Sequence, residues 1–408
     1  MNARRPDHDR MPGNVLIVGG GPAALEAALR LHRLAGDRVT TTLLAPDTDF
    51  TYRPLSVLEP FAAGRAWSYP LARIAGDAGF THRHGKLARV NAAEHVVETT
   101  DGERIGYDAL LLATGAVPTR PYAGATVFTG SPADAETLHG LVQDVEGGYT
   151  HSIAFVAPPG LTWPLPLYEL ALMLAERAFE MGIDVELHIV TPEVAPLGLF
   201  GPDAAGEVES LLKTAGIALH TSAHVEEVEA GRVRLGAGGR ELTVQRVVTL
   251  PRLDGPAIAG LPSDPGGFLV TDLHGRVTGV PDVYAAGDLT AFPVKQGGLA
   301  CQQADAAAAQ IAADAGADVE PEPFKPVLRG MLLTERWARF LRRDAAGRGD
   351  HADVAGRALW WPPTKIAGRE LAGYLQTLDE QLGRVQGRPV ETGLPGDARA
   401  VEVLSLHS

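Results

Sequence analysis

Residues 15–26 read Val-Leu-Ile-Val-Gly-Gly-Gly-Pro-Ala-Ala-Leu-Glu, and this stretch decides the fold. Its four apolar residues at 15–18 are typical of a strand that is buried on both faces of a parallel sheet. Gly19, Gly21 and Ala24 follow with the G-x-G-x-x-A spacing, and a helical pattern comes next. The stretch therefore predicts a strand, a tight turn and a helix that together bind a dinucleotide.

Each small residue of this motif has a physical task. Gly19 permits the tight turn, Gly21 lets a pyrophosphate approach the backbone, and Ala24 lets the helix and strand pack closely. The helix N-terminus, at Pro22 and Ala23, offers free N–H groups and a partial positive charge to the pyrophosphate. The alternative is a glycine-rich turn that binds no ligand.

The composition of the whole chain is that of a globular protein. Its 408 residues predict two or three domains, with 45% hydrophobic and 21% charged residues. The net charge of −14 disfavours nucleic acid or an anionic membrane as an electrostatic partner. No apolar run approaches the length of a membrane span, and Cys301 as the single cysteine excludes an internal disulfide. We expect a disordered tail at 1–13 with Met1 or Met11 as the start, no signal peptide, and a cytoplasmic protein.

The first half of the chain continues the dinucleotide-binding pattern. A strand at 39–44 is followed by Asp47, which lies two residues beyond the strand tip and is a candidate for holding ribose hydroxyls. Asp101-Gly102 predicts a hairpin turn. A buried strand then ends in Ala113-Thr114-Gly115.

The second unit loosely repeats the first but has a different turn. A strand at 153–157, a helix at 167–181 and a strand at 185–190 are followed by Thr191-Pro-Glu193. The loop at 157–167 is rich in proline where a nicotinamide site has glycines. Prolines lack the N–H that would bind phosphate, and their rings occupy its approach. This half predicts a dinucleotide fold without an ordinary dinucleotide site.

Near residue 255 the chain is expected to return to the first unit. Strands are predicted at 268–272 and 283–286, the latter running into Gly287-Asp288, and an Ala-rich helix at 298–313. A further helix is expected from Ile366. The fold class is α/β, with two Rossmann-like domains and a small C-terminal region. The expected divisions are the tail at 1–13, a first dinucleotide-binding domain at 14–120 and 255–325, a second, dinucleotide-binding-like domain at 121–254, and the C-terminal region at 326–408.

Three motifs in this order, at 19–24, 113–115 and 287–288, resemble those of the two-dinucleotide-binding-domain flavoproteins, the pyridine nucleotide-disulfide oxidoreductase superfamily. The resemblance covers about residues 14–330 and implies FAD as cofactor, with an FAD-binding domain at 14–120 and 255–325 and an NAD(P)-binding-like domain at 121–254. It implies that Asp288 hydrogen bonds the ribityl chain and that the following helix points its N-terminus at the flavin, where it would stabilise negative charge. The implied cofactor-binding residues are Gly19, Gly21, Pro22, Ala23, Ala24, Asp47, Arg53, Ala113, Thr114, Gly115, Gly287, Asp288, Lys295, Gln296 and Gly297.

Three segments, at 50–55, 293–298 and 362–366, resemble sulfide:quinone oxidoreductases, the flavoprotein subunit of flavocytochrome c sulfide dehydrogenase and type II NADH dehydrogenases. This resemblance implies that Lys295 lies near the flavin, where a cation would stabilise the reduced ring; a solvated loop lysine is the alternative. Arg53 could meet a phosphate or the flavin edge, or be a surface arginine.

The chain departs from these relatives at the catalytic positions. Sulfide:quinone oxidoreductases use a pair of redox cysteines, and here only Cys301 is present. Cys301 is a catalytic candidate if the helix dipole lowers its pKa; the alternative is a small buried hydrophobe. Glu169 resembles a glutamate that faces the flavin and could donate a proton, or it is a helix-surface glutamate. Gln302 and Gln303 could polarise an acceptor.

The sequence predicts an FAD-dependent oxidoreductase that passes electrons from a small donor to a quinone or other acceptor. One alternative is an NAD(P)H dehydrogenase with an atypical nicotinamide site, and another is a non-catalytic flavin-binding or redox-sensing module. No metal site is expected, because His82 and His84 lack further ligands at suitable spacing.

A basic, amphipathic stretch at 331–343 could touch a membrane, a partner or quinone, or be a core-facing element. Its arginines are Arg336, Arg339, Arg342 and Arg343. Homo-oligomerisation stays open, with Trp337 and 360–361 as a candidate interface.

Overall fold

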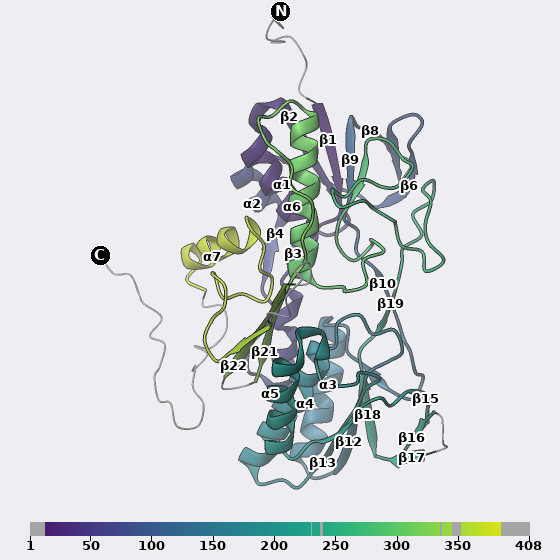
Figure 1. The fold of residues 1–408 in the computed structure, drawn as a ribbon, viewed down its shortest axis with the longest axis vertical. Helices are drawn as coiled ribbons and strands as arrows, with labels where there is room; N and C mark the ends of the chain where they lie inside the picture. Colours follow the sequence, from purple (N-terminus) through teal and green to yellow (C-terminus); the bar gives the residue numbers. More distant parts are fainter. Residues whose placement is uncertain (1–12, 230, 237–239, 335–336, 345–351, 385–408) are drawn as a thin grey trace, which may run out of the picture.

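A computed structural model describes residues 13–229, 231–236, 240–334, 337–344 and 352–384. Two five-stranded parallel sheets lie one beyond the other along the long axis of the molecule (Figure 1). The mixed α/β architecture confirms the predicted fold class. The expected tail at 1–13, including both candidate start residues, falls outside the described part except for Gly13.

The first sheet has the strand order β20-β9-β1-β2-β5, and all its pairs are parallel. The apolar residues of its central strand β1 are buried because both faces of the sheet are covered, one by the core that contains α1 and α6 and the other by a second apolar cluster. β20 joins it from late in the sequence, so the chain returns to this sheet. The strands are β1 (Gly13–Val18), β2 (Val39–Ala45), β5 (Thr81–His84), β9 (Ala109–Leu112) and β20 (Val283–Ala285).

The second sheet repeats this arrangement with the order β11-β18-β12-β13-β14, again all parallel. Helices α3, α4 and α5 lie beside it in the lower half of Figure 1. The strands are β11 (Thr126–Val127), β12 (Ser152–Val156), β13 (Glu186–Val190), β14 (Ala218–His220) and β18 (Arg246–Thr249), and the helices are α3 (Pro132–Glu146), α4 (Leu165–Met181) and α5 (Pro202–Thr214).

Helices α1 (Pro22–Ala35) and α6 (Gly297–Asp314) run side by side against the first sheet (Figure 1). Alanines line their contact, and Ala24, Ala28 and Ala304 are fully buried. Such small side chains let two helix backbones approach closely, which brings the N-termini of both helices toward the same end of the sheet.

The C-terminal part adds a three-stranded antiparallel sheet and a helix. These are β21 (Val327–Leu333), β22 (Ala338–Asp344), β23 (Ala352–Ala355) and α7 (Leu371–Gln381). In Figure 1 the β21–β22 hairpin lies between the two halves of the molecule, and α7 flanks α1.

Short strands complete the described structure. The turn predicted at Asp101-Gly102 is confirmed, with Gly102 at a φ of +88° between β7 and β8. The additional elements are β3 (Asp49–Thr51), β4 (Ser68–Pro70), β6 (Leu87–Asn91), β7 (Val96–Thr99), β8 (Arg104–Gly106), β10 (Val117–Thr119), β15 (Val225–Glu229), β16 (Arg232–Leu235), β17 (Arg240–Thr243), β19 (Arg252–Asp254), the helix α2 (Leu71–Ala78) and the 3-10 helices η1 (Gly36–Arg38), η2 (Arg53–Phe61) and η3 (Gly198–Phe200).

Two predicted elements are wrong. Residues 268–272 form isolated bridges, such as that of Leu269 with Thr290, because no adjacent strand extends the ladder. The helix expected from Ile366 begins only at Leu371, since the preceding segment is tied to other elements by side chains.

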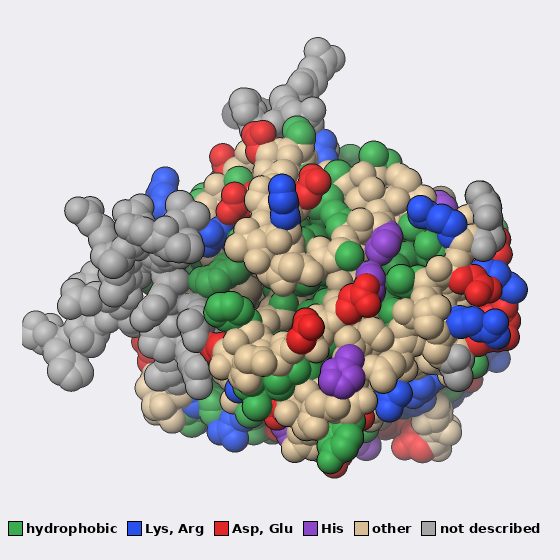
Figure 2. Space-filling view, turned by 90° about the horizontal axis from the view of Figure 1, so that it is seen from below, with side chains coloured by type: hydrophobic (Ala, Val, Ile, Leu, Met, Phe, Trp, Pro, Cys, Tyr) green, Lys and Arg blue, Asp and Glu red, His purple; other side chains and the backbone are tan. Residues whose placement is uncertain are grey.

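The basic stretch belongs to the β21–β22 hairpin. Arg339 is 4% exposed and bonds Glu207 of α5 at 3.0 Å, which agrees with the core-facing alternative. Arg336 lies outside the described residues. On the face seen in Figure 2, basic and acidic side chains are interspersed.

Candidate functional site

The glycine loop between β1 and α1 combines one crowded and one open glycine. Gly19 has a φ of +132°, and a Cβ there would lie 2.2 Å from the Ala113 carbonyl oxygen. A Cβ on Gly21 would meet no heavy atom within 4 Å. No side chain caps the α1 N-terminus in the described residues. The loop therefore packs against the end of β9 on one side and presents open space and N–H groups on the other, which fits a pyrophosphate.

The structure brings the three motifs together at one edge of the first sheet. The motif after β9 includes Gly115, with a φ of +77°, and Thr114, which is exposed. Gly287, after β20, has a φ of +88°, and a Cβ there would lie 3.3 Å from both Ala23 and Ala300. Because β20, β9 and β1 are neighbours, their carboxyl ends form one site where parallel sheets commonly bind ligands.

Lys295 and Asp288 form the charged part of this edge. Lys295 is 6% exposed, donates to the Thr290 carbonyl oxygen, and lies 4.0 Å from the centre of the Phe268 ring. Burial lowers the pKa of Lys295 to about 8, although Asp288 and Asp264 oppose the shift. Burial raises the pKa of Asp288, and Lys295 partly offsets this. The solvated-lysine alternative is wrong, because this lysine is buried and lies near the half-buried carboxyl group of Asp288.

The glutamines near α6 hold the chain's own backbone. Gln296 accepts from Leu299 N at 2.8 Å, capping the helix, and donates to the Arg329 carbonyl oxygen at 3.0 Å. Gln302 both donates to and accepts from Val327 of β21, at 3.0 and 2.9 Å. Gln303 accepts from Gly287 N at 2.7 Å. These contacts give the three side chains positioning roles that the sequence did not indicate.

Cys301 is a buried thiol. It is 1% exposed, and its Sγ donates to the Pro22 carbonyl oxygen at 3.7 Å. Burial, with Glu26 and Asp305 nearby, raises the pKa of Cys301 well above its ordinary value. The structure therefore agrees with the buried-hydrophobe alternative and not with a thiol whose pKa is lowered by the helix dipole.

Three other predicted cofactor residues are exposed or face another part of the chain. Asp47, beyond β2, and Arg53, at the start of η2, are both exposed. Gly297 faces the C-terminal segment instead, where a Cβ would lie 3.0 Å from the Ile366 side chain.

Glu169 connects four parts of the chain. It lies in α4 and is fully buried, so the helix-surface alternative is wrong. Its carboxylate oxygens lie 2.6 and 2.7 Å from Lys365 Nζ, and Oε1 accepts from Leu333 N at 2.8 Å. Lys365 also donates to the Pro54 carbonyl oxygen at 3.1 Å. The sequence did not single out Lys365; the only signal was that it lies within the segment 362–366.

Burial acts on both members of this ion pair. It raises the pKa of Glu169 and lowers the pKa of Lys365, although each charge opposes the shift of the other. The free energies of the charged and the neutral forms of the pair are therefore closer together than in water, which is what a group that holds and releases a proton requires.

In the second unit, an acidic side chain and a helix N–H group that could bind a dinucleotide are hydrogen-bonded to other parts of the chain. Glu193, just beyond β13, accepts from Tyr168 OH at 2.6 Å and from Thr191 Oγ1 at 3.0 Å. At the α4 N-terminus Pro166 has no N–H, and Leu167 N bonds the Pro164 carbonyl oxygen at 3.0 Å. An acid and helix N–H groups are the usual means of binding ribose and phosphate. Here the acid already accepts two hydrogen bonds, one first-turn N–H is missing and another is bonded within the chain.

Aromatic packing adds to this closure. The Trp163 ring meets Phe200 edge-on, with centroids 5.8 Å apart, and Phe200 is fully buried. Gly330 of β21 faces the Phe200 ring, where a Cβ would come within 2.6 Å. The C-terminal hairpin is thus packed onto the second unit beside the proline-rich loop.

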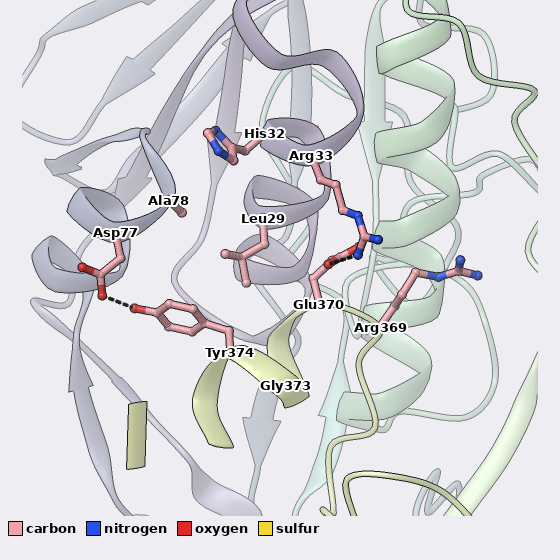
Figure 3. A pocket seen from close by; sticks show the side chains of 9 residues that line it. All are labelled: Leu29, His32, Arg33, Asp77, Ala78, Arg369, Glu370, Gly373 and Tyr374. Carbon is pink, nitrogen blue, oxygen red and sulfur yellow. Dashed lines mark hydrogen bonds and ion pairs between the residues drawn. The ribbon is translucent and has the colours of Figure 1, made fainter. Parts of the chain in front are cut away.

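A hollow of about 670 Å³ lies elsewhere, between α1, α2 and α7 (Figure 3). Several of its polar side chains bond one another: Tyr374 OH donates to Asp77 at 2.9 Å, and Arg33 lies 3.0 Å from Glu370. None of the predicted site residues lines it. We therefore place the candidate site at the glycine loop and not in this hollow.

In the described residues, no helix is long and apolar enough to span a membrane. The same part of the chain holds no group of three or more His, Cys, Asp or Glu side chains arranged for a metal ion.

The sequence is similar to known oxidoreductases. A NADH dehydrogenase-like protein of Mycobacterium tuberculosis is 29% identical over 293 residues, covering 68% of this chain and 72% of that protein. The sulfide-quinone reductase of Aquifex aeolicus is 26% identical over 271 residues, and the match spans 62% of each chain.

The fold is similar to that of a solved sulfide:quinone oxidoreductase from Aquifex aeolicus. The two structures have a TM-score of 0.77 at 21% identity, covering 91% of this chain and 90% of that one. The family model of pyridine nucleotide-disulphide oxidoreductases matches residues 13–147 and 169–315. The chain therefore belongs to the pyridine nucleotide-disulphide oxidoreductase family and is a flavin-dependent oxidoreductase of the sulfide:quinone oxidoreductase and NADH dehydrogenase-like branch.

Proposed function

We propose that the protein binds FAD at the edge of the first sheet and passes electrons from a small donor other than NAD(P)H to a quinone or another small acceptor. FAD, when bound, supplies a ring that takes up two electrons from one substrate and gives them to another. The glycine loop and the uncapped α1 N-terminus would hold its pyrophosphate, and Asp288 its ribityl chain.

Lys295 would provide positive charge beside the ring. It is held in place by the Thr290 carbonyl oxygen and the Phe268 ring, so little reorganisation is needed when negative charge develops nearby. Asp288 lies in the same site and favours the charged form of Lys295.

Glu169 and Lys365 would hold the proton that accompanies electron transfer to the acceptor. Both are buried, and together they connect α4, β21 and η2 through direct bonds. A proton exchanged between such a pair and a substrate stays out of bulk water.

The main support for a donor other than NAD(P)H is the hydrogen bond that Glu193 accepts from Tyr168. With the acid hydrogen-bonded within the chain and prolines in the loop, the second unit offers a dinucleotide fewer ribose and phosphate partners than an ordinary site does. The acceptor class is supported by the Aquifex aeolicus relative, whose name gives a quinone.

A second candidate is an NAD(P)H dehydrogenase in which the nucleotide binds in an atypical way. It is favoured by the name of the Mycobacterium tuberculosis relative, which is NADH dehydrogenase-like.

An anaerobic titration of the FAD-loaded protein separates the two candidates. We expect the visible flavin band to persist at micromolar NADH and NADPH, to bleach with dithionite, and to return with a soluble quinone. Rapid bleaching by either nucleotide would replace our proposal with the second candidate. A protein that cannot take up FAD would contradict the cofactor assignment itself.

A further inference from the structure

We propose that Tyr52 is a positioning residue that sets the place of Lys365 against Glu169. This inference rests on the proposed function. Tyr52 lies between β3 and η2 and is 2% exposed. Its hydroxyl oxygen accepts a hydrogen bond from Ile366 N at 2.7 Å, across 314 residues of sequence.

The bond matters because the segment that carries Lys365 is neither helix nor strand. Residues 356–370 have no ladder or helical bonds to fix their register. Lys365 is tied at its Nζ to the Pro54 carbonyl oxygen, and the next residue is tied at its backbone to Tyr52. Both anchors come from one short stretch, 52–54, so this stretch determines where the ammonium group meets Glu169.

Tyr52 acts through Lys365 and does not exchange protons itself. Burial raises the pKa of the Tyr52 hydroxyl far above neutral pH, so it stays protonated. The titratable side chain that acts on it is that of Cys301 from α6, whereas Lys365 meets it through its backbone. The Lys365 ammonium group lies instead on the Pro54 carbonyl oxygen and on Glu169 of α4. A change in pH profile on altering Tyr52 therefore reports on the Glu169–Lys365 pair, because the pKa of Cys301 also lies well above its ordinary value.

The chain supplies a matched control in Tyr69. This tyrosine is also fully buried, and its hydroxyl donates to Asp379 of α7 at 2.9 Å, again joining the N-terminal and C-terminal parts. Tyr69→Phe thus removes a comparable hydroxyl without touching the segment that carries Lys365.

The test is the pH dependence of reoxidation by a soluble quinone, measured by stopped flow on dithionite-reduced, FAD-loaded protein. We expect Tyr52→Phe to slow reoxidation about ten- to hundredfold, since small displacements of a reacting group have effects of this size, and to move the inflection of the pH profile. Tyr69→Phe should keep the wild-type profile. An unchanged profile in Tyr52→Phe would overturn the inference.

Glu169→Gln separates this inference from the proposed function. If Glu169→Gln leaves the profile unchanged, the proton role of the pair has failed; if only Glu169→Gln alters it, the positioning role alone has failed. Hydrogen exchange of the wild-type protein provides a test that needs no variant. The Ile366 amide should exchange slowly, and fast exchange there would overturn the inference.

Discussion

Glu169 and Lys365 are separated by 196 residues in the sequence, yet their charged atoms lie 2.6 Å apart in a fully buried site. This contact joins a helix of the second unit to the C-terminal segment. The pair therefore holds two parts of the fold together. Its contribution to stability can be measured separately from the proton role proposed above.

Removing one partner of this pair should lower the free energy of unfolding more than removing both. Glu169→Gln or Lys365→Met leaves a buried charge uncompensated, with an expected loss of about 3–5 kcal/mol in the free energy of unfolding. The double variant should be more stable than either single one. Chemical denaturation checks this, and strictly additive losses would show that the two groups do not interact.

Two glycines of the first loop should respond differently to alanine. Gly19→Ala places a Cβ 2.2 Å from the Ala113 carbonyl oxygen at a positive φ, so we expect a loss of at least about 2 kcal/mol in stability. Gly21→Ala has room in the protein and should fold normally but fail to retain FAD, because the Cβ would occupy the pyrophosphate path. Thermal unfolding and the flavin content of the purified variants check both; full flavin in Gly21→Ala would contradict our placement of the cofactor.

Glu26 should make stability depend on pH. It is fully buried in α1 and accepts from Glu370 N and Leu371 N at the start of α7, both at 2.9 Å. Burial raises its pKa from 4.5 to about 7. Between these values the folded chain holds a proton that the unfolded chain has lost, so stability falls as pH rises from 4.5 to 7, by about 3 kcal/mol.

Glu26→Gln should remove this part of the pH dependence. Denaturation at pH 5 and at pH 8 checks it, with the exposed Glu209→Gln of α5 as the control that should behave like wild type. Equal pH dependence in Glu26→Gln and wild type would contradict the prediction.

The positive charge of Lys295 should raise the reduction potential of the flavin. Its pKa of about 8 means that the cation is present below pH 8 and is lost as pH rises above it. Lys295→Met should lower the two-electron reduction potential by about 30–60 mV at pH 7, which corresponds to about 1.4–2.8 kcal/mol. The difference from wild type should shrink above pH 8. A spectroelectrochemical titration measures this, and the exposed Lys325→Met should have no effect.

The parts that could be predicted from the sequence are those determined by neighbouring residues. The apolar run of β1, the glycine loop and the start of α1 are one continuous stretch, and the φ of Gly19 follows from its place in it. The proline-rich loop likewise predicts fewer N–H donors before α4, because the lack of an N–H group is a property of the residue type.

The remainder depends on side chains that meet across the fold. Lys365 reaches Glu169 only because a segment without regular structure is tied to Tyr52 and Pro54. The pKa of Cys301 is raised by burial and by Glu26, which lies 275 positions earlier in the printed sequence. No local pattern contains such contacts.

The bonds between Gln302 and Val327 have a consequence for self-association. β21 is an outer strand of its sheet, and such strands invite pairing with strands of other molecules. The Gln302 amide donates to and accepts from the Val327 backbone as a neighbouring strand would. Gln296 donates to the Arg329 carbonyl oxygen. Along these two residues α6 covers the strand edge, which protects the protein there against the intermolecular β-pairing that leads to aggregation.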